Sequence, residues 1–498
     1  MCGILFCLEE AAQAPDANSW SQVFADLQEA NTARGPDAQD TVCKSFDAYK
    51  LTFFGAELRL RGDGYIAQPH RDLQGNVLCW NGEVLPEEND GTELFSALQQ
   101  TRSPEEIRDV LSSVEGPLIL TSVSVGSRPE YSLDELSTQE FFFIDLAALA
   151  THNARLPPVN RTIPIDPPQF ADLDSPPEHL SAAADELIGH LGDSPYYSAV
   201  ELIVPCWRSS RTGTHVDPAE PIDLLNVAFE NPRKLRFKDG GNENNIPRRE
   251  KQKQKDTIAF SSIDANYDVP DRLTGLQELE ELRRLSPNRT WNFVEINVPY
   301  DEYQAARSTI ENMMFPCRTV MDLSLAAALY FAARGTGQVR DSATADPRLY
   351  QSPAKVLLNG LGSDELLGGY GRFHTRFKGA GWQAIIDELQ LEIDRIPTRN
   401  LGRDDRIISC HGKETRHPFL SLSLVAYLSQ LPVHTKLDPR MEAGVGEKVL
   451  LRVVARKLGL LEASIRKKRA MQFGSHSARM TPGDEYRKGD LLLGSSKE

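Results

Sequence analysis

Residues 359–370 read NGLGSDELLGGY and directly follow KVLLN at 355–359, a short apolar run typical of a strand. Glycines let backbone N–H groups approach an anion closely, and the Asp364 carboxylate is a suitable Mg²⁺ ligand. In the preceding sequence, strand-like and helical patterns alternate. Apolar strand-like runs occur at 223–229 and 292–298, and helical patterns at 274–285 and 319–334. This alternation predicts a doubly wound α/β domain in the second half of the chain.

The first 150 residues have a different pattern. Short apolar runs separated by turn signals occur at 51–60, 76–80 and 141–146, and they predict the strands of an α+β domain. Residues 151–178 are rich in proline and predict a linker. A helical pattern at 178–191 then opens a second domain, which we place at 179–480, with a tail at 481–498.

Composition narrows the class of protein. The chain has 498 residues, 40% of them hydrophobic and 25% charged, which suits a globular protein of two or three domains. Its net charge of −16 argues against a nucleic-acid or membrane partner. There is no apolar run of spanning length and no secretory signal pattern. The seven cysteines are scattered without a CxxC pair, which predicts a cytoplasmic location and gives no metal-site spacing among the cysteines.

The N-terminus suggests a nucleophile. Removal of Met1 would leave Cys2 with its thiol and its α-amine on one residue, and an amine with a pKa near 8 can serve as the base for that thiol. Alone, a cysteine at position two is far more often accidental. Here it is followed by RGPD at 34–37, Arg61, NGE at 81–83 and Asp90.

This set resembles the glutaminase domain of class II amidotransferases, an N-terminal-nucleophile domain with αββα layers. The resemblance implies that Cys2 attacks glutamine. Asn81 and the Gly82 N–H would form the oxyanion hole. Arg61 would bind the carboxylate of glutamine, and Asp90 or the segment at Glu83 its ammonium.

The second half resembles asparagine synthetases in NGLGSDELLGGY, in GKETRHPFL at 412–420, in GEKVLLR at 446–452 and in the basic segment 466–475. NVAFENP at 226–232 and YDVPDRLTG at 267–275 resemble the subgroup of asparagine synthetase domain-containing proteins. The fold so implied is a PP-loop domain, similar to the adenine nucleotide alpha hydrolases.

This resemblance also implies ligands and a reaction. Val227 and Gly360 would flank the adenosine of ATP, Lys448 would face the phosphates and Asp364 would bind Mg²⁺. The implied protein is a glutamine-dependent, ATP-consuming amide ligase, in which ammonia attacks an acyl-adenylate of aspartate or another carboxylate acceptor. The oligomeric state is left open.

Three features depart from the family pattern. Leu361 stands where the family has a glutamate implicated in proton handling, which puts asparagine as the product in question. Residues 194–208 stand where the phosphate-binding SGGxDS loop is expected, and they contain no glycine. After Glu115-Gly-Pro117 the chain continues directly with LILTSVSV, without the strand pair that the resemblance implies.

The codons of residues 194–208 offer an explanation for the missing loop. The last base of each codon joined to the first two of the next allows AVLFSGGIDCTVLA, which is a strand, an SGGxD loop and the start of a helix. We infer a frame shift that enters near Asp193 and leaves near His215, and a deletion after Pro117. Mis-assigned exon boundaries and a decaying gene both account for these lesions. The alternative function is therefore a catalytically degenerate family member that acts as an interaction protein.

Overall fold

The computed structural model describes residues 3–10, 17–46, 49–60, 68–73, 75–83, 90–101, 106, 109–110, 115–123, 144–145, 158–167, 172–192, 220–230, 267–342, 345–442, 444–480 and 491–493. The chain divides into two compact units. Unit 1 comprises Met1–Pro221, Glu280–Thr290 and Pro353–Lys468, and unit 2 comprises Ile222–Leu279, Trp291–Ser352 and Arg469–Glu498. Cys2, Arg61 and the inferred frame-shifted segment lie outside the described residues.

The N-terminal part of unit 1 contains two antiparallel sheets. The first has the order β1-β3-β2 and the second the order β4-β5-β6-β7. The strands are β1 (Gly3–Glu10), β2 (Ala38–Phe46), β3 (Tyr49–Glu57), β4 (His70–Arg71), β5 (Val77–Glu83), β6 (Glu115–Val123) and β7 (Ile144–Asp145).

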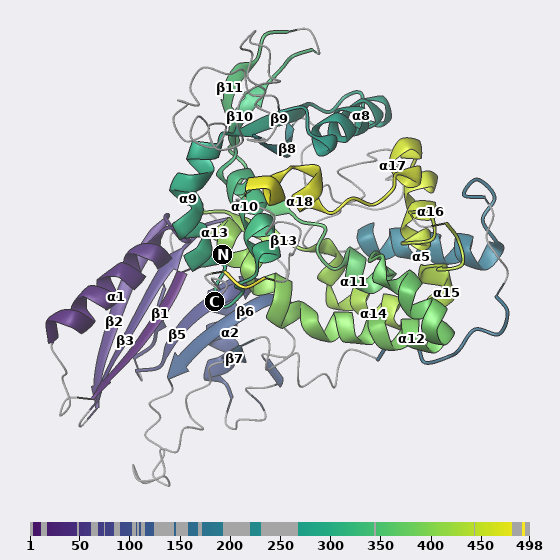
Figure 1. Cartoon of the computed structure of the whole chain (residues 1–498). Helices are drawn as coiled ribbons and strands as arrows, with labels where there is room; N and C mark the ends of the chain where they lie inside the picture. The colour runs from purple at the N-terminus through teal and green to yellow at the C-terminus, as the bar shows by residue number, and fades with distance from the viewer. Residues whose placement is uncertain are drawn as a thin grey trace, which may run out of the picture. The chain divides into compact units, whose positions relative to one another are not determined.

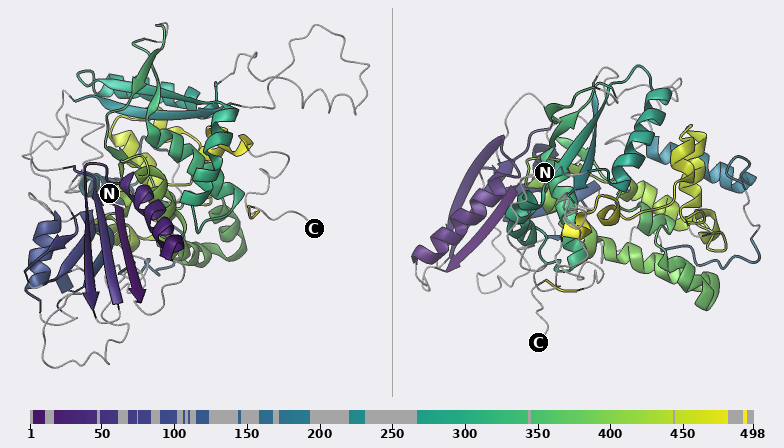
Figure 2. Two further views of the ribbon diagram at one scale, coloured as in Figure 1. Left: turned by 90° about the vertical axis from the view of Figure 1, so that its left-hand side faces the viewer. Right: turned by 45° about the horizontal axis from the view of Figure 1, so that its top comes forward.

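The two sheets share one apolar core. Leu51 and Phe53 of β3 alternate along the strand and meet Val77 and Cys79, which alternate along β5. Helix α1 (Ala17–Thr32) lies against β1 and β3, as Figures 1 and 2 show, and α2 (Asp90–Gln99) lies against β4 and β5. The described elements therefore form four layers in the order helix, sheet, sheet, helix.

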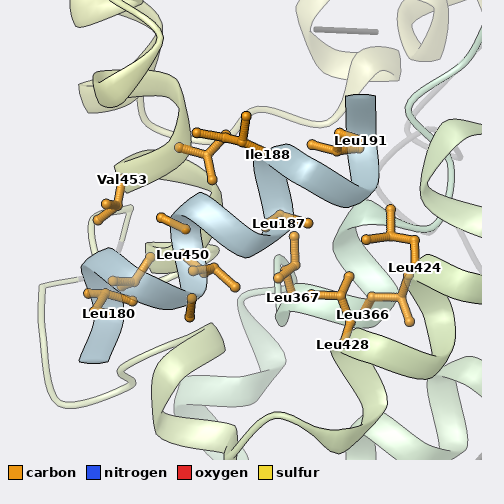
Figure 3. Close-up of a cluster of buried hydrophobic side chains, with 14 of the residues drawn as sticks. Leu180, Leu187, Ile188, Leu191, Leu366, Leu367, Leu424, Leu428, Leu450 and Val453 are labelled. Carbon is orange, nitrogen blue, oxygen red and sulfur yellow. The ribbon is translucent and has the colours of Figure 1, made fainter. Parts of the chain in front are cut away.

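The C-terminal part of unit 1 is mainly helical. Its helices are α5 (Glu178–Gly192), α11 (Ser363–Leu367), α12 (Arg372–Ile396), α13 (Gly402–Ser409), α14 (Leu422–Gln430), α15 (Val433–Lys436), α16 (Val449–Lys457) and α17 (Leu461–Ile465). Leu187 of α5 is fully buried among leucines of α11, α14 and α16 (Figure 3). The 3.6-residue spacing of apolar residues in α5 provides this buried face.

A short parallel strand pair positions the loop at 359. Strands β12 (Val356–Leu358) and β13 (Glu414–Arg416) pair in parallel within unit 1. The five-residue π-helical segment η5 (Pro397–Leu401) precedes α13, and the 3₁₀ turn η6 (Pro418–Leu420) follows β13. Because β12 ends at Leu358, the glycine-rich loop begins at the next residue, Asn359.

Unit 2 is built on a four-stranded sheet of order β11-β10-β9-β8. Its strands are β8 (Ile222–Phe229), β9 (Trp291–Val298), β10 (Thr336–Val339) and β11 (Arg348–Gln351). Strands β8 and β9 pair in parallel, joined through α8 (Pro270–Leu285), whereas β10 and β11 add antiparallel. Helices α9 (Tyr300–Met313), α10 (Val320–Arg334) and α18 (Met471–Gly474) and the turn η7 (Ser477–Met480) complete it.

A buried arginine holds the parallel pair of unit 2 together. Arg272, at the start of α8, donates to the Asn226 side chain of β8 at 2.6 Å. It also donates to Glu295 and Asn297 of β9, at 3.0 and 2.9 Å. Four hydrogen bonds to two strands compensate the desolvation of a side chain that is 5% exposed.

The elements predicted between 222 and 358 are confirmed, with boundaries shifted by a few residues. The structure also differs from the expectation, because the β10–β11 hairpin makes part of the sheet antiparallel. Each of these strands has four residues and mostly exposed or half-buried side chains, so no alternating apolar pattern marks them. The described chain is thus a mixed α/β protein.

Candidate active site

The loop after β12 is shaped by its own polar groups. The Asn359 N–H donates to the Arg416 carbonyl at 2.8 Å, and the Asn359 side-chain oxygen accepts from the Leu361 N–H at 3.0 Å. Gly362 has a φ of 96°, and a Cβ there would lie 2.5 Å from a methyl group of Leu420. A glycine is therefore required where the loop turns into α11.

Asp364 lies between two lysines. One carboxylate oxygen is 2.7 Å from the Lys448 ammonium, and the other is 2.9 Å from that of Lys468. Burial raises the pKa of Asp364, but the two ammonium groups together lower it by more. The pKa of Asp364 is therefore below its usual value. Burial lowers the pKa of Lys468, against the attraction of Asp364. The group thus combines one carboxylate with two lysines.

Lys448 reaches this site from an unusual backbone conformation. It is the N-cap of α16, with a left-handed φ of 54°, and its ammonium also donates to the Ser363 hydroxyl at 2.9 Å. Non-glycine residues in this region are strained and cluster at functional sites. The backbone of Gly369 fills the space beside the pair, because a Cβ there would lie 1.9 Å from Asp364 Oδ1 and 2.4 Å from Lys448 Cε.

Tyr370 adjoins the same group. Its hydroxyl donates to Glu365 at 2.5 Å, and the Asn400 amide donates to the same carboxylate oxygen at 3.1 Å. The Lys468 ammonium lies 4.2 Å from the centre of the tyrosine ring, within the range of a cation–π contact. Burial and the Glu365 carboxylate raise the pKa of Tyr370, so the phenol stays protonated.

The sequence did not single out Lys468, Tyr370 or Glu365 as site residues. The signals for them were present, since Glu365 and Tyr370 belong to the glycine-rich segment and Lys468 to the basic run at 466–469. A run of four basic residues does not indicate which member turns inward.

The charges of the described residues suit the binding of a nucleoside triphosphate together with its metal ion. Two ammonium groups beside one carboxylate leave a positive charge that favours phosphate oxygens. In the described ranges no group of three or more His, Cys, Asp or Glu residues could hold a metal. Mg²⁺ is commonly held by one or two carboxylates together with substrate phosphates, so Asp364 fits a magnesium that arrives with the nucleotide.

The other predicted nucleotide residues are distributed over the two units. Gly360 lies in the loop of unit 1, and a Cβ there would meet no atom within 4 Å, so space is open beside it. Val227 lies in β8 of unit 2, where it is 8% exposed. Asp364 and Lys448 are therefore the predicted pair that the structure brings into contact.

The predicted glutaminase residues lie at the ends of neighbouring elements. Asn81, Gly82 and Glu83 are the last residues of β5, where the pairing with β6 shifts register. Asp90 is the first residue of α2. Strand β1 begins at the residue after Cys2 and contacts β5 within the common core.

Comparisons with known proteins agree with these features. Residues 377–489 match the model of the asparagine synthase family. Asparagine synthetase domain-containing protein 1 of Gallus gallus is 31% identical over 632 aligned residues, which cover 97% of this chain and 98% of that protein. The Homo sapiens protein of the same name is 30% identical, covering 96% of this chain and 95% of its own.

A relative in Saccharomyces cerevisiae, also named as an asparagine synthetase domain-containing protein, is 28% identical over 99% of both chains. The class defined by the second half is thus an asparagine synthase domain. The chain as a whole belongs to the asparagine synthase family, and its relatives with similarity over nearly the full length include asparagine synthetase domain-containing proteins. Within the described residues, no helix combines the length and apolar character needed to cross a bilayer.

Proposed function

We propose that this protein is a glutamine-dependent, ATP-consuming amide ligase of the asparagine synthetase type. The observation that carries the proposal is the Asp364 carboxylate held between Lys448 and Lys468 at the end of a glycine-rich loop. This combination supplies positive charge for phosphates and one oxygen ligand for Mg²⁺.

In the glutaminase half, Cys2 is the proposed nucleophile. Its thiol, deprotonated by the α-amine, would attack the side-chain amide carbon of glutamine and release ammonia, and water would then hydrolyse the thioester to glutamate. Asn81 and the Gly82 N–H would stabilise the oxyanion. Arg61 would bind the substrate carboxylate, and Glu83 or Asp90 the ammonium.

In the ligase half, Lys448 and Lys468 would hold the phosphates of ATP, and Val227 and Gly360 would flank its adenosine. Asp364 would hold the Mg²⁺ that neutralises phosphate charge when the nucleotide is bound. With the nucleotide bound, the lysines would bind phosphate oxygens in place of the carboxylate. The acceptor would be aspartate or another carboxylate, and it need not be aspartate, because Leu361 cannot transfer a proton as the family's glutamate would.

Two segments of this chain need restoring for the ligase reaction. We propose that residues 193–215 encode the phosphate-binding loop in a shifted reading frame, and that a strand pair is missing after Pro117. The alignment with the Gallus gallus relative has 632 positions against the 498 residues of this chain, so that relative has residues without a counterpart here.

A second candidate function is an interaction protein without catalysis. It is favoured by Leu361 and by the absence of glycine from residues 194–208. Mass spectrometry of the N-terminus discriminates the two functions at low cost. A retained Met1 would exclude glutaminase activity, because the α-amine of Cys2 would not be free.

The decisive experiment measures glutamate release by the full chain and by its Cys2→Ala variant. We expect Cys2→Ala to abolish release, because no other group supplies a nucleophile with its own amine. Cys43→Ala is the matched control, since Cys43 is an exposed thiol in β2 and should be dispensable. Unchanged release from Cys2→Ala would refute the glutaminase half of the proposal.

A further inference from the structure

The RGPD segment at 34–37 belongs to the glutaminase-like motifs of the sequence, yet side chains of this segment contact the C-terminal part of unit 1. The Arg34 guanidinium pairs with Asp405 of α13 at 2.9 Å, and the two side chains are only 15% and 12% exposed. Pro36 packs against Gly412, since a Cβ added to Gly412 would lie 3.3 Å from the proline ring. Gly35 faces the N-terminal part itself, since a Cβ there would lie 2.2 Å from the backbone of Ala56.

Helix α13 carries this contact to the glycine-rich loop. Asp404, next to Asp405, is buried and bound by the Arg403 side chain at 2.7 and 2.9 Å. Burial raises the pKa of Asp404, and Arg403 and the Asn359 amide oppose that shift by favouring its charged form. Helix α13 also lies against β13, whose Arg416 carbonyl accepts from the Asn359 N–H at 2.8 Å, so the Arg34–Asp405 pair is connected to the loop through α13 and β13.

A second connection reaches the same loop by another route. Asp37 accepts from the Arg59 N–H at 2.8 Å and from the Lys355 ammonium at 2.9 Å. Lys355 directly precedes β12, and its carbonyl accepts from the Glu414 N–H of β13 at 2.8 Å. Strand β12 then runs into Asn359, so both connections end at the first residue of the loop that carries Asp364.

We propose that Arg34 and Asp37 are positioning residues for the 359–369 loop, so that the RGPD segment sets the geometry of the site formed by Asp364, Lys448 and Lys468. The inference rests on the proposed function only in treating that site as the nucleotide site. Arg34 is the stronger of the two residues. Its ion pair is largely shielded from water, whereas the Lys355 side chain is 49% exposed.

Hydrogen exchange with mass spectrometry on the full chain tests this proposal without glutamine or ATP. In Arg34→Gln we expect the loop amides at 359–369 to exchange about tenfold faster, while those of β3 at 49–57 remain unchanged. Lys355→Met should accelerate the loop less, about threefold. Arg34→Lys keeps a cation at Asp405 and should stay within about twofold of the original chain.

Two further variants complete the experiment. Asp405→Asn removes the same ion pair from the other side, so it replaces Arg34→Gln if that variant does not fold. Arg161→Gln is the matched control, because it breaks an Arg–Asp pair of 2.6 Å that is more than half exposed. This control should leave the loop unchanged.

The outcomes separate positioning from a merely structural role. Faster exchange confined to 359–369 supports the proposal. Unchanged exchange in both Arg34→Gln and Asp405→Asn overturns it, and so does a uniform acceleration that includes β3. Because no substrate is present, loss of the proposed catalytic function would leave this readout intact, so the two failures are distinguishable.

Discussion

The Lys448 ammonium lies 2.7 Å from the Asp364 carboxylate, although the two residues are 84 positions apart in the sequence. The backbone of Lys448 is left-handed. The φ of 54° directs the lysine from the start of α16 onto the start of α11. Conformations of this kind cost on the order of 1–3 kcal/mol and persist where surrounding contacts enforce them. The pair is therefore sensitive to any atom added beside it.

Gly369 provides a direct test of that sensitivity. In Gly369→Ala the added Cβ would overlap Asp364 and Lys448, so we expect the free energy of unfolding to fall by about 1–3 kcal/mol. Gly371→Ala is the matched control, since its Cβ would meet no atom within 4 Å and should change stability by less than about 0.5 kcal/mol. Urea unfolding of both variants measures the difference. Equal stabilities would contradict the close packing at Gly369.

The inferred reading-frame shift predicts that restoring the shifted segment raises the affinity of the chain for MgATP. We expect MgATP to bind at least about tenfold more tightly when residues 194–208 are replaced by AVLFSGGIDCTVLA, because glycines allow backbone amides to surround phosphate. Calorimetric titration measures both affinities. The control replacement AVLFSAAIDCTVLA keeps the strand and removes the glycines, and should lose the gain. Equal affinity in all three chains would remove the main consequence of the frame-shift hypothesis.

Lys436 predicts a specific dependence of stability on pH. Its side chain is 1% exposed, its ammonium donates to the Leu428 carbonyl, and burial lowers its pKa from 10.5 to about 7. Between these values the unfolded chain holds a proton that the folded chain has released, so the stability contributed by this group rises with pH. Relative to Lys436→Met, the original chain should gain about 2 kcal/mol between pH 7 and 9.

Urea unfolding at pH 7, 8 and 9 measures this difference. Lys457→Met is the control, because Lys457 also donates to a backbone carbonyl, that of Ser181, but is partly exposed. A parallel pH profile for the original chain and Lys436→Met would contradict a lowered pKa of Lys436.

Arg272 and Arg340 pair with the same carboxylate, one from a buried and one from an exposed position, so their variants compare the stability that each pair contributes. Both contact Glu295, at 3.0 and 3.1 Å, but the Arg272 side chain is 5% exposed and that of Arg340 37%. Arg272→Met should destabilise the protein by about 3–5 kcal/mol, because it leaves Glu295 and two asparagines without their buried donor. Arg340→Met should cost less than about 1 kcal/mol. Similar losses in urea unfolding would show that burial does not decide the contribution of these pairs.

Local signals explain why much of unit 2 could be predicted. Helix α10 begins after Thr319, which forms a capping box with Asp322, and ends at Gly335 with a left-handed φ of 68°. Both signals lie within the helix and its immediate neighbours, as does its apolar periodicity. The β10–β11 hairpin has no such signal, since its short strands carry mostly exposed or half-buried side chains.

The candidate site was predictable in part for the same reason. The glycines of the 359–370 segment mark a turn that backbone geometry demands, and Asp364 follows at the start of a helix. The contact of Lys468 with Asp364 carries no comparable mark. Four consecutive basic residues have nearly the same chemistry, and their order does not determine which one becomes buried.

By itself the sequence determined the helices α8 and α10 and the strands β9 and β12, to within a few residues at their ends, because periodicity, caps and glycines act over a few neighbouring residues. Only the tertiary structure decided that Arg34 meets Asp405 across 371 residues, that Lys436 is buried with its ammonium on the Leu428 carbonyl, and that two lysines share Asp364. The strength of such contacts depends on exclusion of water, and a charged residue is excluded from water by the packing of segments far away in the sequence.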